Sequence, residues 1–344
     1  MKRTPFVESC LVIGQCAVNW FARRPLVVSF EVTNACTCNC RHCDHGGPLD
    51  EPNLITPDGI RRWMKVLHPG GIQISGGEPL LRDDIIECVR AAQRAGGLPY
   101  TVFVTNASLM TPQKYLALRG AGVDQFSVSL DFPDARHDDF RRSPGLFAHL
   151  DALLPRLAAL GFDDVVLNTA ITSENYKFIN AITDLADEWG VNVSFSAYSP
   201  RRTGDMSYMV TEPEELAELR RQFDVLLARK EDDPRGRIVN SRTTLEDTYK
   251  YFERGGSPNC TAGLRFLVVT ADGYLQPCSM HFCKYLEQRK LVAEFTANNT
   301  CDECYVAIRS YLDKGFWQLL AENVGDHFSF RLRRDRGRAR AGVA

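Results

Sequence analysis

Short apolar runs alternate with amphipathic segments over the first two thirds of the chain. Six runs are rich in β-branched and aromatic residues and have Gly, Asn or Asp near their ends, as expected for buried strands. In chain order they are LVVSFEVTN, GIQISGGEP, YTVFVTNAS, DQFSVSLDF, DVVLNTAIT and VNVSFSAYSP. Segments between them, such as LRDDIIECVRAAQRAG, place apolar residues at helical spacing and end on capping residues. The pattern predicts six strand and helix units.

Strands that alternate with helices indicate a parallel sheet, because each crossover returns the chain in the same direction. Six such units predict an α/β fold, a partial (β/α)6 TIM-like barrel. In this kind of fold, the loops that follow the strands meet on one face and carry the chemistry. The first four runs are followed by TNACTCNCRHC, SGGEP, TNAS and SLD. We therefore expect the reactive groups at that edge.

The same patterning suggests four parts of the chain. Residues 1–25 are expected to form an N-terminal helical segment, and 26–230 the barrel. Residues 231–325 are expected to form a small C-terminal hairpin and helix domain, and 326–344 a basic, disordered tail. The segment EPEELAELRRQFDVLLARKEDD predicts an amphipathic helix between the two domains.

Composition and charge favour a globular enzyme. The chain has 344 residues, 44% of them apolar, and a formal net charge of -2, so nothing in its charge suggests a nucleic-acid partner. No uncharged apolar stretch approaches the roughly 18 to 20 residues of a membrane span. We expect a cytoplasmic protein. The N-terminal apolar stripe is expected to pack on the barrel, with contact to a membrane surface as the less favoured alternative.

Twelve cysteines change this picture. Cytosolic thiols are kept reduced and a chain of this length needs no disulfides, so metal ligation becomes the leading interpretation. Six cysteines precede residue 44 and five follow residue 259. This distribution predicts two separate sites.

The first group, CTCNCRHC, runs from Cys36 to Cys43. Cys36, Cys40 and Cys43 have the spacing C-x3-C-x2-C, and three thiolates on a four-iron cluster leave one iron open to another ligand. With this spacing after its first strand, the sequence resembles the radical S-adenosylmethionine (SAM) superfamily. The resemblance implies a catalytic 4Fe-4S cluster on these three thiolates, and makes Cys38 a non-ligand.

The resemblance covers roughly residues 26 to 200 and implies further contacts to SAM. SGGEP is similar to the GGEP motif of the family, so Gly76, Gly77 and Glu78 are expected to hold the methionine amino group. His42 stands before the third cysteine, where it is expected to pack near the adenine. Other strand-end positions implied as SAM contacts are Asn106, Ser129, Asp131 and Asn168. Each of these four could equally be an ordinary turn or cap residue.

The second group begins with Cys260, an apolar run, a DG turn and another run that reaches Cys278. This is the pattern of a hairpin that brings two thiols together. Cys301 and Cys304 form a C-x2-C pair, and four thiolates complete a closed zinc or iron-sulfur site.

After a radical SAM core, this arrangement resembles the twitch domain, a shortened relative of the SPASM domain. The resemblance implies one auxiliary 4Fe-4S cluster on the second group. Zinc remains the alternative, and Cys283 could replace one of the four ligands.

Four functions follow from these features. The favoured one is a radical SAM oxidoreductase that cleaves SAM reductively to a 5'-deoxyadenosyl radical and then oxidises or rearranges a small hydroxyl-bearing metabolite. Twitch-type relatives that dehydrogenate an aminocyclitol alcohol suggest it, and a flavodoxin or ferredoxin would supply the electron. The alternatives are a peptide-modifying enzyme, a lipid-modifying enzyme, and a non-catalytic iron-sulfur or zinc protein. The peptide alternative is less favoured because no peptide-recognition domain is evident before residue 26.

Overall fold

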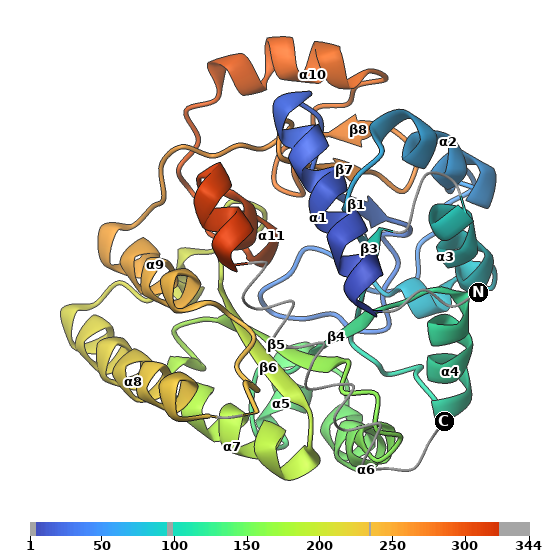
Figure 1. Cartoon of the computed structure of the whole chain (residues 1–344). Helices are drawn as coiled ribbons and strands as arrows, with labels where there is room; N and C mark the ends of the chain where they lie inside the picture. Colours follow the sequence, from blue (N-terminus) through green and yellow to red (C-terminus); the bar gives the residue numbers. More distant parts are fainter. Residues whose placement is uncertain (1–4, 95–98, 234, 323–344) are drawn as a thin grey trace.

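A computed structural model describes residues 5–94, 99–233 and 235–322 of the chain (Figure 1). The basic tail expected over residues 326–344 lies outside these described residues.

All six expected strands form, and each pairs in parallel with the next along the chain. Their bounds are β1 Val27–Glu31, β2 Gly71–Ser75, β3 Tyr100–Thr105, β4 Gln125–Ser129, β5 Val165–Ile171 and β6 Asn192–Ala197. Helices connect them, as the alternating pattern requires. The predicted α/β fold is confirmed, with the strand ends that carry the motifs at one edge of the sheet.

The C-terminal hairpin joins this same sheet. Its first strand, β7 (Phe266–Val269), pairs in parallel with β1, and its second, β8 (Leu275–Gln276), pairs antiparallel with β7. Gly273 takes the left-handed conformation that the turn needs, with a φ of 84°. The strand order is therefore β6-β5-β4-β3-β2-β1-β7-β8. In an open sheet β1 would be an edge with unpaired backbone groups, and β7 satisfies them.

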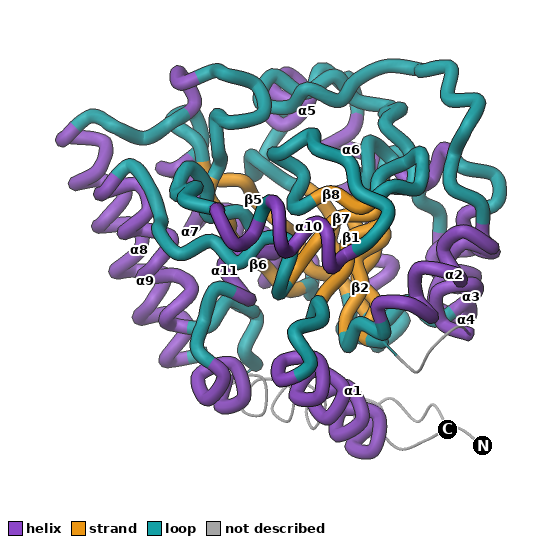
Figure 2. Tube along the Cα trace, turned by 90° about the horizontal axis from the view of Figure 1, so that it is seen from above, coloured by secondary structure: helices purple, strands orange, loops and turns teal. Residues whose placement is uncertain are grey.

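Helices follow each strand and lie around the sheet, with α2 to α4 on one side and α7 to α9 on the other (Figure 2). Thr56 and Thr111 cap α2 and α4 by accepting backbone N–H bonds, each followed by a proline in the first turn. The helices are α1 Pro5–Phe21, α2 Pro57–Leu67, α3 Ile85–Arg94, α4 Pro112–Ala121, α5 Arg136–Arg141, α6 Leu146–Ala158, α7 Ile179–Trp189, α8 Pro213–Asp232, α9 Arg242–Arg254, α10 Gln288–Glu294 and α11 Ala307–Leu312. Short 3-10 turns occur at Pro79–Leu81, Tyr176–Phe178, Met206–Tyr208 and Thr296–Asn298.

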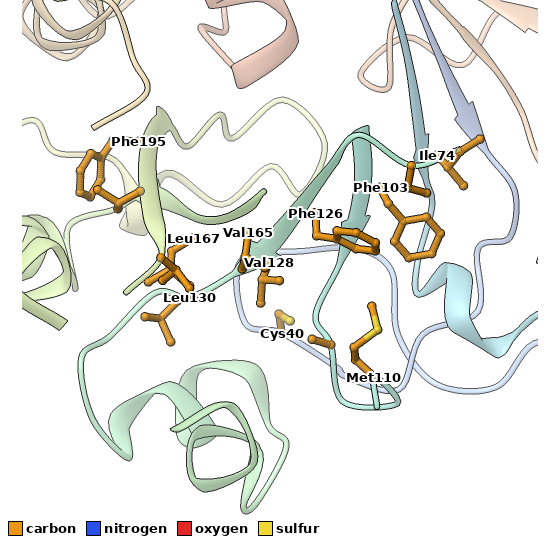
Figure 3. Packing of buried hydrophobic residues seen from close by; sticks show 14 of the residues in the cluster. Cys40, Ile74, Phe103, Met110, Phe126, Val128, Leu130, Val165, Leu167 and Phe195 are labelled. Atoms are coloured by element: carbon orange, nitrogen blue, oxygen red, sulfur yellow. The ribbon is translucent and has the colours of Figure 1, made fainter. Parts of the chain in front are cut away.

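One face of the sheet packs against the surrounding helices. Alternate residues of a strand point to opposite faces, and on this face almost every side chain is aliphatic or aromatic and buried. Members of this layer, most of them labelled in Figure 3, are Ile74, Phe103, Phe126, Val128, Val165, Leu167 and Phe195. Burial of this layer from water is the main favourable term that holds sheet and helices together.

Helix α1 packs at the end of the sheet where β1 and β2 begin. The side-chain amide of Asn19, which is buried, donates to the carbonyl oxygens of Pro25 and His68 at 2.7 and 2.8 Å. A Cβ atom at Gly70 would come within 2.4 Å of the Cys16 sulfur, so the contact is close. The expected packing of this segment on the barrel is observed at Cys16 and Asn19, whereas Leu11, Val18 and Phe21 stay exposed. Of the helices that the structure describes, none is long and apolar enough to cross a membrane.

Candidate functional site

The cysteine loop follows β1 directly and is held by backbone hydrogen bonds. The Cys36 amide donates to the carbonyl of Gly47 at 3.1 Å, which closes the loop. The Asn39 amide donates to the carbonyl of Arg141 at 3.3 Å. Because Arg141 is the last residue of α5, this short helix supports the loop from the side of β4.

Three of the loop thiols form a chain of hydrogen bonds. Cys40 donates to Cys38, which raises the pKa of Cys40, and Cys38 donates to Cys36, which lowers the pKa of Cys36. Burial raises the pKa of Cys43, which lies near Cys40. Cys38 is buried and close to two predicted ligands. That it does not bind the cluster therefore stays a prediction.

The GGEP turn approaches the cysteine loop backbone to backbone. A Cβ atom at Gly76 would lie 2.2 Å from the carbonyl oxygen of Thr33, and one at Gly77 would lie 2.1 Å from that of Ala35. Gly76 also has a φ of 137°, which disfavours any other residue. The Gly77 and Glu78 amides donate to the Thr33 and Ala35 carbonyls, both at 2.8 Å. The two glycines thus let this turn hold the residues that lead into the cysteine loop.

Glu78 is fully buried and its carboxylate accepts three hydrogen bonds from the protein. The donors are the Leu80 amide at 3.0 Å, the Thr105 hydroxyl at 2.7 Å and the Asn106 amide at 2.7 Å. Burial raises the pKa of Glu78, against the effect of these bonds. The carboxylate therefore joins the ends of β2 and β3. Its predicted bond to the SAM amino group would have to form in addition to these three.

Asn106 lies against the cysteine loop. Its side-chain nitrogen donates to the Thr37 hydroxyl at 2.9 Å and lies 3.6 Å from the Cys36 sulfur. Ser129 ends β4 and is paired in register with Asn168, which lies in the middle of β5 and whose side-chain oxygen accepts from the Ser194 hydroxyl at 3.0 Å. The structure therefore places Asn106 and Ser129 at the carboxyl ends of their strands, and Asn168 within its strand beside Ser129. Their contacts with SAM stay predictions.

Asp131 lies beside Arg141. It is fully buried, and its carboxylate accepts a hydrogen bond from Arg141 Nε at 2.7 Å. The carbonyl of Arg141 also holds the cysteine loop. The Oδ1 atom of Asp131 has no hydrogen-bond partner among the described residues, and its contact with SAM stays a prediction. The sequence did not single out Arg141, and its spacing of ten residues from Asp131 matches no motif.

His42 stacks on Phe140, with ring centroids 4.6 Å apart and an angle of 12° between the planes. Burial lowers the pKa of His42 to about 4, so the ring is neutral at pH 7. Its Nδ1 atom is buried without a partner among the described residues. A neutral flat ring with a spare polar atom fits the predicted place beside an adenine.

The second cysteine group surrounds one cavity of about 40 Å³ between β7 and α11. Cys260, Cys278, Cys301 and Cys304 all line it, together with apolar side chains such as Phe266 and Val268. These are the four cysteines that the sequence predicted as ligands. Cys283, the possible replacement, is not among the described residues that line the cavity. Four thiols from three separate segments match the donor set of a closed iron-sulfur or zinc site.

The thiols of this second group are not yet arranged for a metal. Burial raises the pKa of Cys260 to about 11 and also raises those of Cys278 and Cys304, so the thiols must lose protons when they bind a metal. In the described part of the chain, no three potential ligands already surround one metal position. The cavity has room for about one water molecule. A four-iron cluster would therefore have to move the thiols outward.

Arg309 joins the segments that carry these cysteines. The side chain is fully buried. Its Nη1 atom donates to the Cys304 carbonyl oxygen at 2.5 Å and lies 3.8 Å from the Cys304 sulfur. Its Nη2 atom donates to the carbonyl of Pro258, and its Nε atom donates to Asp313. A buried cation at this place offsets the negative charge of thiolates. The sequence analysis missed it, although an arginine within the apolar stretch YVAIRSYL was a usable signal.

The other face of the sheet carries many polar side chains, although β3 presents Tyr100, Val102 and Val104 there, between β2 and β4. Register places serine, asparagine and glutamine side chains of several strands beside one another on it. They are Ser29, Gln73, Ser75, Gln125, Ser127, Ser129, Asn168, Ser194 and Ser196. We call these nine residues the polar inner face. Alternation in QFSVS and NVSFSA could have predicted it from the sequence.

Known proteins are similar to this chain over much of its length. The sequence model of the Radical SAM superfamily matches residues 30–185. An AdoMet-dependent heme synthase from Methanosarcina barkeri (strain Fusaro / DSM 804) is 28% identical over 271 residues, which cover 74% of this chain and 76% of that protein. Mycofactocin maturase MftC from Mycolicibacterium smegmatis (strain ATCC 700084 / mc(2)155) is 27% identical over 250 residues, which cover 70% of this chain and 59% of that protein.

Among solved structures, Streptococcus suis SuiB bound to S-adenosylmethionine resembles this fold with a TM-score of 0.59 and 18% identity. The match covers 76% of this chain and 63% of SuiB, so the chain spans less than two thirds of that protein. SuiB has also been solved bound to its precursor peptide SuiA. At this level of identity the likeness establishes the fold.

An α/β sheet with a C-x3-C-x2-C loop after β1 and a glycine-rich turn after β2 defines an enzyme that uses an iron-sulfur cluster with SAM. Residues 30–185 of the chain form a radical SAM domain. Its cofactors are accordingly a 4Fe-4S cluster and S-adenosylmethionine.

Proposed function

We propose that this radical SAM enzyme oxidises or rearranges a small hydroxyl-bearing metabolite, as one step of a biosynthetic reaction sequence. The observation that carries the proposal is the polar inner face of the sheet. Ser29 and Gln73 of this face also line the cavity of the second cysteine group, and the strand ends carry the first group. Hydroxyl and amide side chains between two cysteine groups suit a substrate rich in hydroxyls.

Cys36, Cys40 and Cys43 would hold the catalytic cluster, whose free iron would take SAM beside the GGEP turn and His42. When bound, cluster and SAM supply a 5'-deoxyadenosyl radical after one electron arrives from a flavodoxin or ferredoxin. The chain itself contributes the positions of these groups. The glycines of the GGEP turn and the Asn106 side chain fix the loop, and the α5 backbone supports it from the other side.

Cys260, Cys278, Cys301 and Cys304 would hold an auxiliary 4Fe-4S cluster, with Arg309 beside it as a buried cation. Such a group supplies the acceptor that a net two-electron oxidation needs. The hydroxyl and amide groups of the polar inner face would orient the substrate and replace its water shell.

The properties of the polar inner face also weigh against an apolar macrocycle, which is the kind of compound that the name of the heme synthase suggests. Pockets for large apolar ligands are lined mainly by hydrophobic and aromatic side chains. Here serine, asparagine and glutamine take most of those positions, beside Val102, Val104 and Val166.

A peptide substrate is the second candidate. It is favoured by the similarity to a mycofactocin maturase and by the shared fold with SuiB, which has been solved with its precursor peptide. A peptide would have to reach the same polar inner face with a single side chain.

Deuterium transfer separates the two candidates. The protein is reconstituted anaerobically with iron and sulfide, reduced, and given SAM with carbon-deuterated polyols or with deuterated peptides. We expect deuterium in 5'-deoxyadenosine from a polyol. Deuterium from peptides alone would overturn the favoured proposal, and failure to form any 5'-deoxyadenosine would overturn both.

A further inference from the structure

Helix α1 turns an uncharged face to solvent. The helix lies at the outer edge of the molecule (Figure 2). Its packed side carries Asn19, which donates to two backbone carbonyls, and Cys16, which lies close to Gly70. Every exposed residue between Ser9 and Phe21 is apolar or small, and these residues are Cys10, Leu11, Gly14, Val18 and Phe21. This distribution is the reverse of that in an ordinary surface helix, whose exposed face is polar.

Aromatic rings extend this face beyond the helix. Phe316, which follows α11, has its ring centroid 5.5 Å from that of Trp20 and 5.2 Å from that of Phe21. The next residue, Trp317, is 77% exposed, and Phe21 is 75% exposed. Single exposed apolar side chains are common on proteins, whereas several that adjoin one another mark an interaction site. We call the following residues the α1 surface: Leu11, Val18, Phe21 and Trp317.

Positive charge lies at the end of the α1 surface. Arg23 and Arg24 follow the helix, both are exposed, and neither forms an ion pair with a residue that the structure describes. The guanidinium of Arg265 lies over the Trp20 ring, 3.4 Å from its centroid, and the charge of Arg23 helps to lower the pKa of Arg265. The chain leaves the described part five residues after Trp317, and residues 323–344 contain six arginines and two aspartates. An apolar surface thus borders a region of excess positive charge.

This combination favours a lipid surface over a second copy of the chain. In a two-fold contact of the α1 surface with itself, Arg23 and Arg24 of both copies would come together and repel one another. The carboxylates of the adjoining segment offer no compensation, because Asp313 and Glu322 each already form an ion pair. An anionic bilayer instead takes up apolar and aromatic side chains at the level of its headgroups, and its phosphates pair with the arginines.

We propose that the α1 surface, with Arg23 and Arg24, attaches the protein reversibly to an anionic lipid bilayer. Helix α1 would lie along the membrane plane with its uncharged face at the boundary between headgroups and acyl chains. One helix face buries too little apolar area for a permanent anchor, so attachment also depends on the arginines and weakens in salt. The proposal concerns where the enzyme is held, and it leaves the substrate of the proposed function unchanged.

Vesicle flotation tests the proposal. The reconstituted holoenzyme is mixed with vesicles of phosphatidylglycerol and phosphatidylcholine in equal parts, or of phosphatidylcholine alone. We expect binding to the anionic vesicles and much weaker binding to the neutral ones. Arg23→Gln combined with Arg24→Gln should weaken binding to the anionic vesicles about thirtyfold, at about 1 kcal/mol for each basic residue near such a surface. Salt at about 1 M, which shortens the Debye length to about 3 Å, should release the wild type.

Matched variants on α8, away from α1 in Figure 1, serve as controls. Val18→Ser should weaken binding about tenfold, the effect of losing one valine side chain from the apolar layer. Val225→Ser, at another exposed valine, should bind as the wild type does. Arg220→Gln combined with Arg221→Gln removes as much charge as the double variant after α1, and it should also bind normally. Iron content and unfolding temperature show whether each variant is folded.

Three results would overturn the proposal. The first is a wild-type protein that does not bind anionic vesicles, or a double variant of Arg23 and Arg24 that binds them as tightly as the wild type. The second is an equal loss in the α8 controls, which would make total charge the cause. The third is a dimer, seen by sedimentation without lipid, that Val18→Ser dissociates, because the α1 surface would then face a second copy. Formation of 5'-deoxyadenosine in solution should be the same in all these variants, so the test does not bear on the proposed function.

Discussion

The two cysteine groups are assembled in different ways. The first lies in one loop of eight residues, and backbone bonds from the GGEP turn and from α5 hold that loop. The second collects thiols from three segments up to 44 positions apart, and the buried side chain of Arg309 joins them. The contiguous loop is held by backbone hydrogen bonds, which the glycines of the GGEP turn allow to form at close range. The dispersed site is held by side-chain bonds between segments, of which those of Arg309 to the carbonyls of Pro258 and Cys304 are the most buried.

The largest expected effect follows from removing the first group. Replacement of Cys36, Cys40 and Cys43 by alanine should abolish SAM cleavage and leave about four irons per chain, against about eight in the wild type. Iron and zinc analysis after anaerobic reconstitution measures this. A triple variant that retains zinc and no iron would contradict the auxiliary cluster and the oxidation built on it.

Arg309 provides the matching experiment at the second group. Arg309→Met leaves Asp313 buried without its partner, so we expect the free energy of unfolding to fall by about 3 to 5 kcal/mol. In the triple cysteine background the remaining iron should fall as well, because the segments with Cys260 and Cys304 lose the buried bonds that Arg309 makes to both. Arg289→Met, on an exposed position of α10, is the control. Unchanged iron in Arg309→Met would show that the site does not depend on this side chain.

Glu78→Gln is expected to have a smaller effect. Glutamine can accept at one oxygen only, so one of the bonds from Thr105 or Asn106 is lost, and unfolding should cost about 1 to 3 kcal/mol less. SAM affinity should also fall while the cluster remains, since the turn after β2 supports the loop. Denaturant unfolding and SAM binding are measured on the same preparation. An unchanged SAM affinity would mean that Glu78 serves only the protein.

The smallest effect is expected for Cys38→Ala. If Cys36, Cys40 and Cys43 are the ligands, iron content and SAM cleavage should stay close to those of the wild type. Cys40→Ala, changed in the same loop, should lose both. Because the Cys38 thiol lies between two predicted ligands, the comparison is a direct test of which three bind. Equal losses in the two variants would show that the wrong three were chosen.

Much of the fold could be predicted because its signals are local. The six strands and their helices follow from patterns within 10 to 20 residues, and so does the hairpin with its Asp272–Gly273 turn. The pairing of β7 with β1 could not be predicted. It joins Val28 to Leu267, and nothing in either segment specifies a partner so far along the chain. An edge strand can pair with strands of many different sequences, since the hydrogen bonds between them involve only backbone groups.

By itself the sequence determined the class of protein and the cysteines that were named. Cys36, Cys40 and Cys43 lie within eight residues, where chain connectivity leaves little freedom, and the GGEP turn follows directly after the next strand. Tertiary structure decided which charges have partners. Asp131 turned out to pair with Arg141, and Glu78 to accept hydrogen bonds from Thr105 and Asn106. Whether a carboxylate is paired depends on residues that folding brings from distant segments, so no local pattern could reveal it.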